Sequence, residues 1–268
     1  MFPLSDEQTR LLAMCVLGLL CLALVVATFR VYQNLRVAPM QLPIYMFNQF
    51  MSRVIWRAEV DGHVRLPAGQ GAVIVCNHRS PIDPGFIALA CDRQVHWMVA
   101  REYCSHPLVG WALKTLQVIP TGRGGVDTAA TKLAMRYAQQ GELVGMFPEG
   151  RLNETSNLML PGRPGAALVA LKARVPVVPC YITGSPYEGS VFGFLFMTAK
   201  ARLRVGEPID ISEYYGREGQ REVLDEMTKR FMREIALLAG VPNYEPVLAG
   251  KHWKATVPME NALEAAAN

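Results

Sequence analysis

The sequence predicts an α/β fold in which helices flank a mixed, largely parallel sheet, preceded by an N-terminal transmembrane helix. Apolar runs of strand length alternate along the chain with segments of helical periodicity, an order typical of α/β proteins. An uncharged apolar run near the N-terminus is long enough to cross a bilayer. Apolar residues make up 51% of the chain and charged residues 19%, which excludes a largely disordered protein.

Length, charge and cysteine content narrow the possible functions. Once the terminal segments are set aside, about 200 of the 268 residues remain, enough for one domain with a sizeable core. The net charge of +4 is too small to indicate nucleic acid binding and suits an anionic membrane surface or an anionic substrate. None of the six cysteines forms a C-x-x-C pair, so we expect reduced thiols rather than a disulfide framework.

The first 36 residues are expected to form a membrane anchor. Residues 11–29 contain no charge, Pro, Asn or Gln. As a helix they span about 28 Å, close to the roughly 30 Å of a hydrocarbon core. A cleaved signal peptide is the alternative, and the acidic residues Asp6 and Glu7 argue against it. The basic residues Arg30 and Arg36 follow the run, which predicts a single-pass membrane protein with its main domain on the cytoplasmic side.

Residues 37–57 are expected to contain an amphipathic helix. Ile44, Phe47, Met51 and Val54 recur at spacings of three and four, as on one face of a helix. One interpretation is a core helix that buries this stripe. The other is a helix that lies in the membrane interface beside the anchor, and the sequence alone leaves both open.

A globular domain is expected over residues 58–240, with a tail over residues 241–268. Continuously apolar runs bounded by Gly or Pro predict buried strands. Segments with apolar residues at every third or fourth position, several of them ended by Gly, predict helices. The expected strands are 71–78, 96–100, 118–120, 142–147, 175–182 and 199–205, and the expected helices are 84–91, 107–116, 128–140, 165–173 and a last one ending at Gly240.

The first candidate for chemistry follows the first of these strands directly, in the segment 77–83 with the sequence NHRSPID. A His is the common general base near neutral pH, and an Asp bonded to one ring nitrogen fixes the tautomer and stabilises the imidazolium. His78 and Asp83 would lie about 140° apart around a continuous helix, so they can meet only if the segment turns. Ser80-Pro81 supplies that break, because Ser caps helices and Pro suits the first helical position.

The alternative interpretation of this segment is structural. Asp83 would then only cap the helix, and His78 would be an ordinary loop residue. A metal site is not expected, because no second cluster of ligands accompanies the pair.

Three further segments lie at predicted strands. Residues 147–151, FPEGR, combine the acceptor oxygens of Glu149, a Gly that permits close backbone approach, and an Arg that can bind an anion. Residues 120–125, PTGRGG, place Arg123 among glycines, where it can meet a phosphate. Residues 175–179, VPVVP, predict only a strand. Each segment alone fits an ordinary turn or strand equally well.

Together and in this order, the four segments resemble the sequence blocks of the glycerophospholipid acyltransferase family, especially the 1-acylglycerol-3-phosphate acyltransferases. The resemblance covers roughly residues 56–210 and is specific because four blocks match in register. The matches are Asn77, His78, Ser80 and Asp83 in N-H-x-S-x-x-D, Arg123 in the second block, residues 147–150 in F-P-E-G, and Val175, Pro176 and Pro179 in V-P-x-x-P.

The chain departs from the family pattern in two blocks. In the second block, Gln117 stands where a Gly is usual and Gly122 where an Asp is frequent. After F-P-E-G, the family's Arg usually comes one position later than Arg151, so either Arg151 or Arg163 is expected to take that role. These departures concern the identity of the acceptor more than the chemistry.

The resemblance implies a glycerolipid acyltransferase-like fold and an acyl transfer. His78 would deprotonate the acceptor hydroxyl with Asp83 in support, and acyl-CoA or an acyl carrier protein would supply the acyl group as a thioester. The acceptor would be a lysophospholipid, above all 1-acylglycerol-3-phosphate, and the product phosphatidic acid. No metal or other cofactor is implied. The residues expected to hold the glycerol phosphate are Arg123, Glu149 and Gly150, assisted by Arg151 or Arg163.

Two parts of this hypothesis have alternatives or open details. Backbone N–H groups near the start of the helix after Ser80 are candidates for stabilising the oxyanion. The acceptor could be another lipid hydroxyl, or the same His-Asp pair could activate water in a hydrolase, although the G-x-S-x-G motif of serine hydrolases is absent. A catalytically silent membrane-binding module is the remaining alternative.

Overall fold

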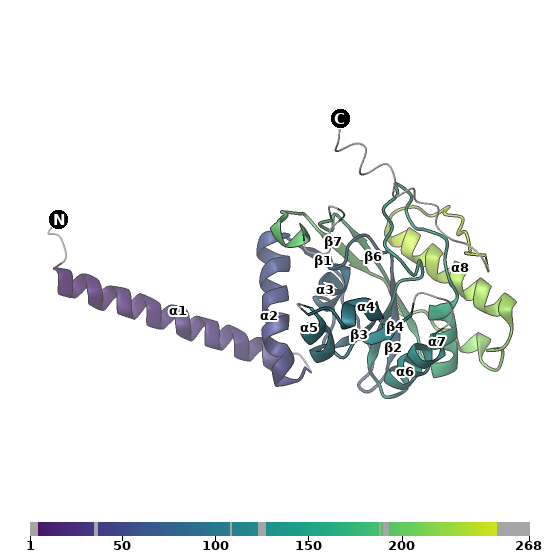
Figure 1. Cartoon of the computed structure of the whole chain (residues 1–268), viewed down its shortest axis with the longest axis horizontal. Coiled ribbons are helices and arrows are strands. Elements are labelled where there is room, and N and C mark those ends of the chain that lie inside the picture. Colours follow the sequence, from purple (N-terminus) through teal and green to yellow (C-terminus); the bar gives the residue numbers. More distant parts are fainter. Residues whose placement is uncertain are drawn as a thin grey trace.

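The computed structural model describes residues 5–34, 37–107, 109–122, 127–187, 189 and 193–250. Its main body is a three-layer arrangement in which a sheet lies between two groups of helices (Figure 1). The helices are α1 (Asp6–Asn34), α2 (Leu42–Phe50), α3 (Asp83–Ala88), α4 (Arg101–Cys104), α5 (Gly110–Thr115), α6 (Thr128–Gln139), α7 (Gly165–Ala173) and α8 (Arg221–Leu238), with short turns η1 (Pro39–Gln41), η2 (Met51–Ile55), η3 (Gly193–Phe196) and η4 (Ser212–Tyr214).

The sheet has seven strands within the described residues, in the order β1-β7-β6-β2-β5-β3-β4. All neighbouring pairs are parallel except β6 and β7, so the predicted mixed, largely parallel sheet flanked by helices is confirmed. The strands are β1 (Glu59–Asp61), β2 (Ala72–Cys76), β3 (Val95–Ala100), β4 (Ile119–Thr121), β5 (Leu143–Met146), β6 (Val177–Thr183) and β7 (Arg202–Val205).

Strand β2 lies at the centre of the sheet and is buried along its whole length. Because side chains alternate across a strand, Val73 and Val75 enter the core under α6, α7 and α8, whereas Ile74 and Cys76 enter the core that contains Trp56 and α3. A strand covered on both faces has to be continuously apolar. The carboxyl end of β2, at Cys76, leads directly from the core into the segment that begins with Asn77.

The prediction of individual elements was wrong in two places. Strand β1 was not expected, since its three residues show no apolar run and its pairing with β7 spans a long stretch of chain. The helix expected over 107–116 begins only at Gly110, and the short α4 precedes it. Gly110 N–H donates to the His106 carbonyl at 2.8 Å, so a turn takes the place of the expected first helical residues.

Helix α2 and the π-turn η2 form one rod at the edge of the domain (Figure 1). The stripe expected over residues 44–57 is split between two environments: Met51 is buried, whereas Phe47 and Val54 are exposed. On the inner side, Asn48 Nδ2 donates to the Gly85 carbonyl at 2.8 Å, which holds α2 against α3. The rod is thus a core helix on one face and carries exposed aromatic side chains on the other.

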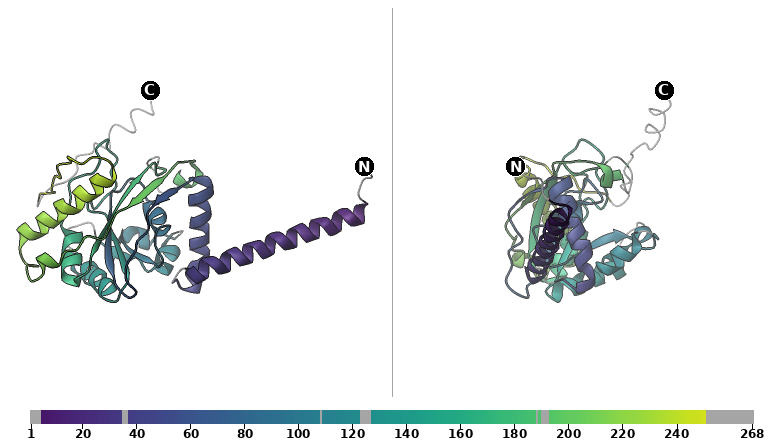
Figure 2. Two further views of the ribbon diagram at one scale, coloured as in Figure 1. Left: turned by 180° about the vertical axis from the view of Figure 1, so that it is seen from behind. Right: turned by 90° about the vertical axis from the view of Figure 1, so that its left-hand side faces the viewer.

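Helix α1 extends away from the domain as one continuous helix (Figures 1 and 2). Its described side chains, at residues 7–19, 22 and 26, are exposed, and the other side chains of the predicted span lie outside the described residues. Across the described part of the chain, no helix combines the length and the apolar character needed to cross a membrane. The predicted transmembrane helix is therefore not found there.

Candidate active site

The segment 77–83 leaves the carboxyl end of β2 and turns across the edge of the sheet. Asn77 fixes its start, because its side chain donates to the Ile182 carbonyl at 2.9 Å and accepts from the Ile182 N–H at 2.8 Å. These two bonds join the turn to the neighbouring strand β6 and satisfy a buried amide. The carboxyl edge of such a sheet is where sites usually form in α/β proteins.

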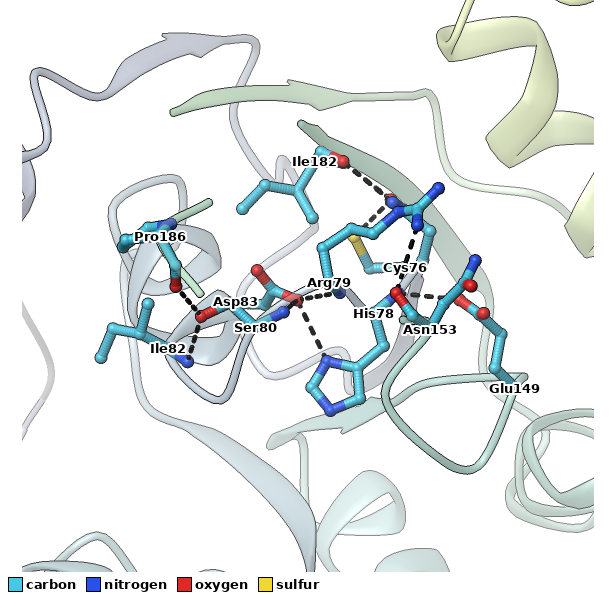
Figure 3. Close-up of polar contacts among 11 residues, drawn as sticks. Cys76, His78, Arg79, Ser80, Ile82, Asp83, Glu149, Asn153, Ile182 and Pro186 are labelled. Carbon is cyan, nitrogen blue, oxygen red and sulfur yellow. Dashed lines mark hydrogen bonds and ion pairs between the residues drawn. The ribbon is translucent and has the colours of Figure 1, made fainter. Parts of the chain in front are cut away.

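His78 and Asp83 meet across the turn (Figure 3). His78 Nδ1 lies 3.0 Å from Asp83 Oδ2, and α3 begins at Asp83 itself. The same carboxylate oxygen accepts the backbone N–H groups of Arg79 at 2.6 Å and Ser80 at 2.8 Å. The break at Ser80-Pro81 therefore brings the pair together, as the sequence predicts. The interpretation in which Asp83 only caps a helix does not account for its contact with the imidazole.

The imidazole of His78 is held on one face and open at one nitrogen. Its ring stacks on Phe147 with centroids 3.6 Å apart and planes 6° apart, and Phe147 in turn stacks on Trp97. The side chain is 16% exposed. Because Asp83 engages Nδ1, that nitrogen carries the proton in the neutral ring and Nε2 is left as the acceptor of a proton. This is the geometry that a general base requires.

The candidate oxyanion donors near the start of α3 are engaged within the turn. Arg79 and Ser80 give their N–H groups to Asp83, Ile82 N–H lies 3.4 Å from Ser80 Oγ, and Asp83 N–H donates to the Ser80 carbonyl at 3.1 Å. These hydrogen bonds stabilise the turn. The four N–H groups, which were expected to be available to an oxyanion, are therefore already engaged with protein acceptors.

Glu149 is fully buried beside the backbone of His78. Its Oε1 accepts the backbone N–H of His78 at 2.8 Å (Figure 3). Its Oε2 accepts the N–H of Leu160 at 2.8 Å. Burial raises the pKa of Glu149 to about 7, against the opposing effect of these hydrogen bonds and of the Arg79 guanidinium. The sequence predicts a contact with the acceptor, whereas this placement favours positioning of the His78 backbone.

Arg79 is a residue of the site that the sequence analysis did not single out. Its guanidinium donates to the carbonyl oxygens of Asn153 at 3.2 Å, Thr155 at 2.6 Å and Leu158 at 3.5 Å, and also to that of Asn157. The Asn153 N–H in turn donates to the His78 carbonyl at 2.8 Å. The loop after F-P-E-G is thus joined to the His-Asp turn by Arg79, a residue of the segment NHRSPID whose charge was visible in the sequence.

The remaining predicted site residues occupy different positions. Gly150 adopts φ +68, and a Cβ placed there would lie 3.0 Å from Cδ of Arg163, so the Arg163 side chain passes directly over this glycine. Arg163 and Arg151 are both exposed on this side of the site. Arg123 lies outside the described residues, between Gly122 and the helix that begins at Thr128.

Comparison with known proteins gives consistent matches. The family model described as "Acyltransferase" matches residues 57–183. A 1-acyl-sn-glycerol-3-phosphate acyltransferase of Bacillus subtilis (strain 168) is 29% identical over 150 residues, which are 56% of this chain and 72% of the relative. The 1-acyl-sn-glycerol-3-phosphate acyltransferase alpha of Homo sapiens is 30% identical over 140 residues, 49% of this chain and 47% of the relative. The chain therefore spans about half the length of the human relative.

One solved structure extends the likeness to the fold. The crystal structure of the 1-acyl-sn-glycerophosphate (LPA) acyltransferase, PlsC, from Thermotoga maritima superposes with a TM-score of 0.55 at 24% identity, covering 77% of this chain and 85% of that one. At this identity the comparison supports a shared fold. The segments that carry the His-Asp turn and the F-P-E-G loop lie inside the family match at residues 57–183.

Proposed function

This chain belongs to the acyltransferase family, of the 1-acylglycerol-3-phosphate acyltransferase type, and we propose that it transfers a fatty acyl chain from acyl-CoA or an acyl carrier protein to 1-acylglycerol-3-phosphate, giving phosphatidic acid. The family membership makes it an O-acyltransferase. The observation that carries the mechanism is the 3.0 Å contact between His78 Nδ1 and Asp83 Oδ2 at the edge of the sheet. Donor and acceptor are proposals that rest on the chemistry of the site and on the relatives.

His78 acts as the general base in this proposal. Nε2 takes the proton of the acceptor hydroxyl while its oxygen attacks the thioester carbonyl, and Asp83 stabilises the imidazolium that forms. The tetrahedral intermediate then collapses, and His78 returns the proton to the leaving thiolate. The stack on Phe147 keeps the ring plane fixed through both proton transfers. The reaction as written needs no metal and no further cofactor.

Glu149 and Arg79 position the base rather than touch the substrate. Glu149 accepts the His78 N–H, and Asn153, held by Arg79, donates to the His78 carbonyl. Both the N–H and the carbonyl of His78 are therefore held by hydrogen bonds. Misplacement of a catalytic group by about 1 Å can cost a hundred-fold in rate, so this support matters for turnover.

The acceptor phosphate is assigned to the arginines beside F-P-E-G. Arg163 passes over Gly150, and Arg151 is exposed next to it. The positive φ of Gly150 lets the backbone turn here without a side chain, so that Arg163 can lie close over it. A guanidinium group can donate charge-assisted hydrogen bonds to a phosphate. Arg123, which lies outside the described residues, is proposed as a further phosphate ligand from its place among glycines in the sequence.

A membrane location with the catalytic domain on the cytoplasmic side is part of the proposal. Its support is the apolar N-terminal run followed by Arg30 and Arg36, and the exposed apolar side chains on α1 and α2. The lipid substrate of the proposed reaction resides in a bilayer, so both reactants can meet at its surface.

The test is a thiol-release assay in detergent with a panel of acceptors. Thiol release from acyl-CoA or an acyl carrier protein should depend on added lysophosphatidate, and mass analysis should find phosphatidic acid. Release that is equally fast without any acceptor would instead identify a hydrolase. Preference for a neutral monoacylglycerol would keep the acyltransferase chemistry but overturn the proposed acceptor.

A further inference from the structure

We propose that η3, with Phe196 at its tip, is a second membrane contact that acts together with the exposed face of α2 and inserts into an anionic bilayer surface. This inference rests on the proposed function, because it takes the lipid acceptor to come from a membrane. Phe196 is 91% exposed, the highest value among the large apolar side chains that the structure describes as exposed. An aromatic side chain that protrudes into solvent has no role in the core.

The turn η3 is fixed against the rod formed by α2 and η2. Trp56 Nε1 donates to the Met197 carbonyl at 3.1 Å, and the ring of Trp56 contacts that of Phe194 with centroids 6.0 Å apart. The Ala201 N–H donates to the Trp56 carbonyl at 3.1 Å. Figures 1 and 2 show η3, in green, next to the end of the rod. Phe196 is therefore presented by an anchored turn, although it lies far from α2 in the sequence.

The exposed face of the rod carries apolar side chains of the same kind. Phe47, Phe50 and Val54 are all more than half exposed, and their spacing of three and four places them on one face. Together with Phe196 they form what we call the α2–η3 patch. Helix α1, which precedes α2 in the chain, also carries exposed Leu and Val side chains. The exposed apolar surface of α2 therefore continues toward the N-terminus.

Basic side chains accompany this patch and identify the occupant. Arg53 and Arg57 are exposed beside Val54, and Lys200 is exposed four residues after Phe196. Aromatic side chains flanked by Arg and Lys are typical of surfaces that lie in the headgroup region of anionic membranes, because the rings enter the acyl boundary while the cations face the phosphates. This combination favours a lipid surface over a second copy of the chain, whose identical patch would bring like charges together.

The α2 half of the patch is connected to the His-Asp turn, and the chain before η3 also touches this turn. Asn48 on the inner side of α2 donates to the carbonyl of Gly85, two residues after Asp83. On the other side, Ser80 Oγ donates to the Pro186 carbonyl at 2.6 Å, in the segment that leads toward η3. Seating the patch on a bilayer would therefore bring the His-Asp turn toward the membrane that holds the lysolipid, through the contact of α2 with Gly85.

The experiment uses the full chain and one added tryptophan. Phe196→Trp places an indole at the proposed contact. Val247→Trp places one at an exposed apolar position (60% exposed) in the segment after α8, where the Val247 carbonyl accepts the Gly162 N–H. Helix α8 lies on the opposite side of the domain from α2 (Figure 1). Each variant is mixed with phosphatidylcholine–phosphatidylglycerol vesicles whose acyl chains are brominated, and quenching is read against the wild type, which has four tryptophans. The proposal expects quenching of the added fluorescence for Phe196→Trp and none for Val247→Trp.

A functional arm accompanies the fluorescence. Phe196→Ser should lower acyl transfer to vesicle-borne lysophosphatidate by about ten-fold, the effect of withdrawing one large apolar side chain from the membrane, and should leave transfer in detergent micelles unchanged. The inference would be overturned if Phe196→Trp showed no quenching, or if both tryptophan variants were quenched equally. It would also be overturned if the chain, without lipid, formed a dimer that covers the α2–η3 patch. A wild type that transfers no acyl group in detergent would instead overturn the proposed function, whatever the quenching shows.

Discussion

Glu149 offers the sharpest perturbation of the site, because one atom change separates positioning from substrate binding. Glu149→Gln keeps the size of the side chain but leaves one acceptor oxygen for two N–H donors, those of His78 and Leu160. The amide NH₂ must then face one of these donors. If the oxygen stays on Leu160, the backbone of His78 loses its partner and the imidazole shifts.

The magnitude follows from the lost contact. A hydrogen bond to a charged group contributes about 1.5–3 kcal/mol, and a buried donor left unpaired costs a similar amount. We therefore expect kcat to fall by about ten- to a hundred-fold. The KM for the acceptor should stay the same, because the fully buried carboxylate does not contact it.

The stability of the same variant should depend on pH with a defined sign. Burial raises the pKa of Glu149 to about 7 from its ordinary value of 4.5, so between these values the folded protein binds more protons at this site than the unfolded chain does. The unfolding free energy of the wild type then falls as the pH rises through this window, by at most about 3 kcal/mol. The Gln variant cannot titrate here, so its disadvantage should be largest at acid pH and should shrink toward pH 8.

The assays are steady-state kinetics with varied acceptor and denaturant unfolding across this pH range. Glu154→Gln is the matched control, since Glu154 is exposed in the same loop and bonds only Tyr187 among the contacts described for it. We expect the control to change stability by less than about 0.5 kcal/mol. A raised acceptor KM with unchanged kcat would refute the positioning role and return Glu149 to the acceptor site.

Three other predictions concern other residues assigned to the proposed site. Arg79→Met should lower the unfolding free energy, measured in urea, by about 1.5–3 kcal/mol, because several loop carbonyls lose their hydrogen-bond donor. The control is Arg221→Met, which removes an exposed i,i+4 ion pair and should lower the unfolding free energy by about 0.3–0.5 kcal/mol. Arg123→Ala should lower kcat/KM for lysophosphatidate by roughly ten- to a hundred-fold and much less for monoacylglycerol; equal losses would make Arg123 structural. Asp83→Asn should lower kcat less than removal of the base does, and an unchanged kcat would show that the carboxylate charge is not used.

The central part of the fold was predictable because its signals are local. The apolar run of β2, the break at Ser80-Pro81 and the polar pair His78 and Asp83 all lie within one short segment, and the structure places them as that segment predicts. The alternation of strands and helices likewise fixes a largely parallel sheet.

The parts that escaped prediction depend on contacts distant in the sequence. In the sequence, Glu149 is predicted to offer its oxygens to a substrate or to solvent. In the structure, these oxygens accept the N–H groups of His78 and Leu160, which are 71 and 11 residues away along the chain. Strand β1 exists through its pairing with β7. The stripe from Ile44 to Val54 could not reveal which of its residues face α3, because that face is chosen by the packing of Asn48 on Gly85.

The measurement that tests the central claim most directly is the turnover of His78→Ala in acyl transfer to lysophosphatidate, with the unfolding transition recorded alongside. Nε2 of His78 is the proposed proton acceptor, held by the 3.0 Å contact of Nδ1 with Asp83. The account predicts a loss of about 10²–10⁴-fold in kcat with a cooperative unfolding transition retained. A folded His78→Ala enzyme with near-normal turnover would contradict it.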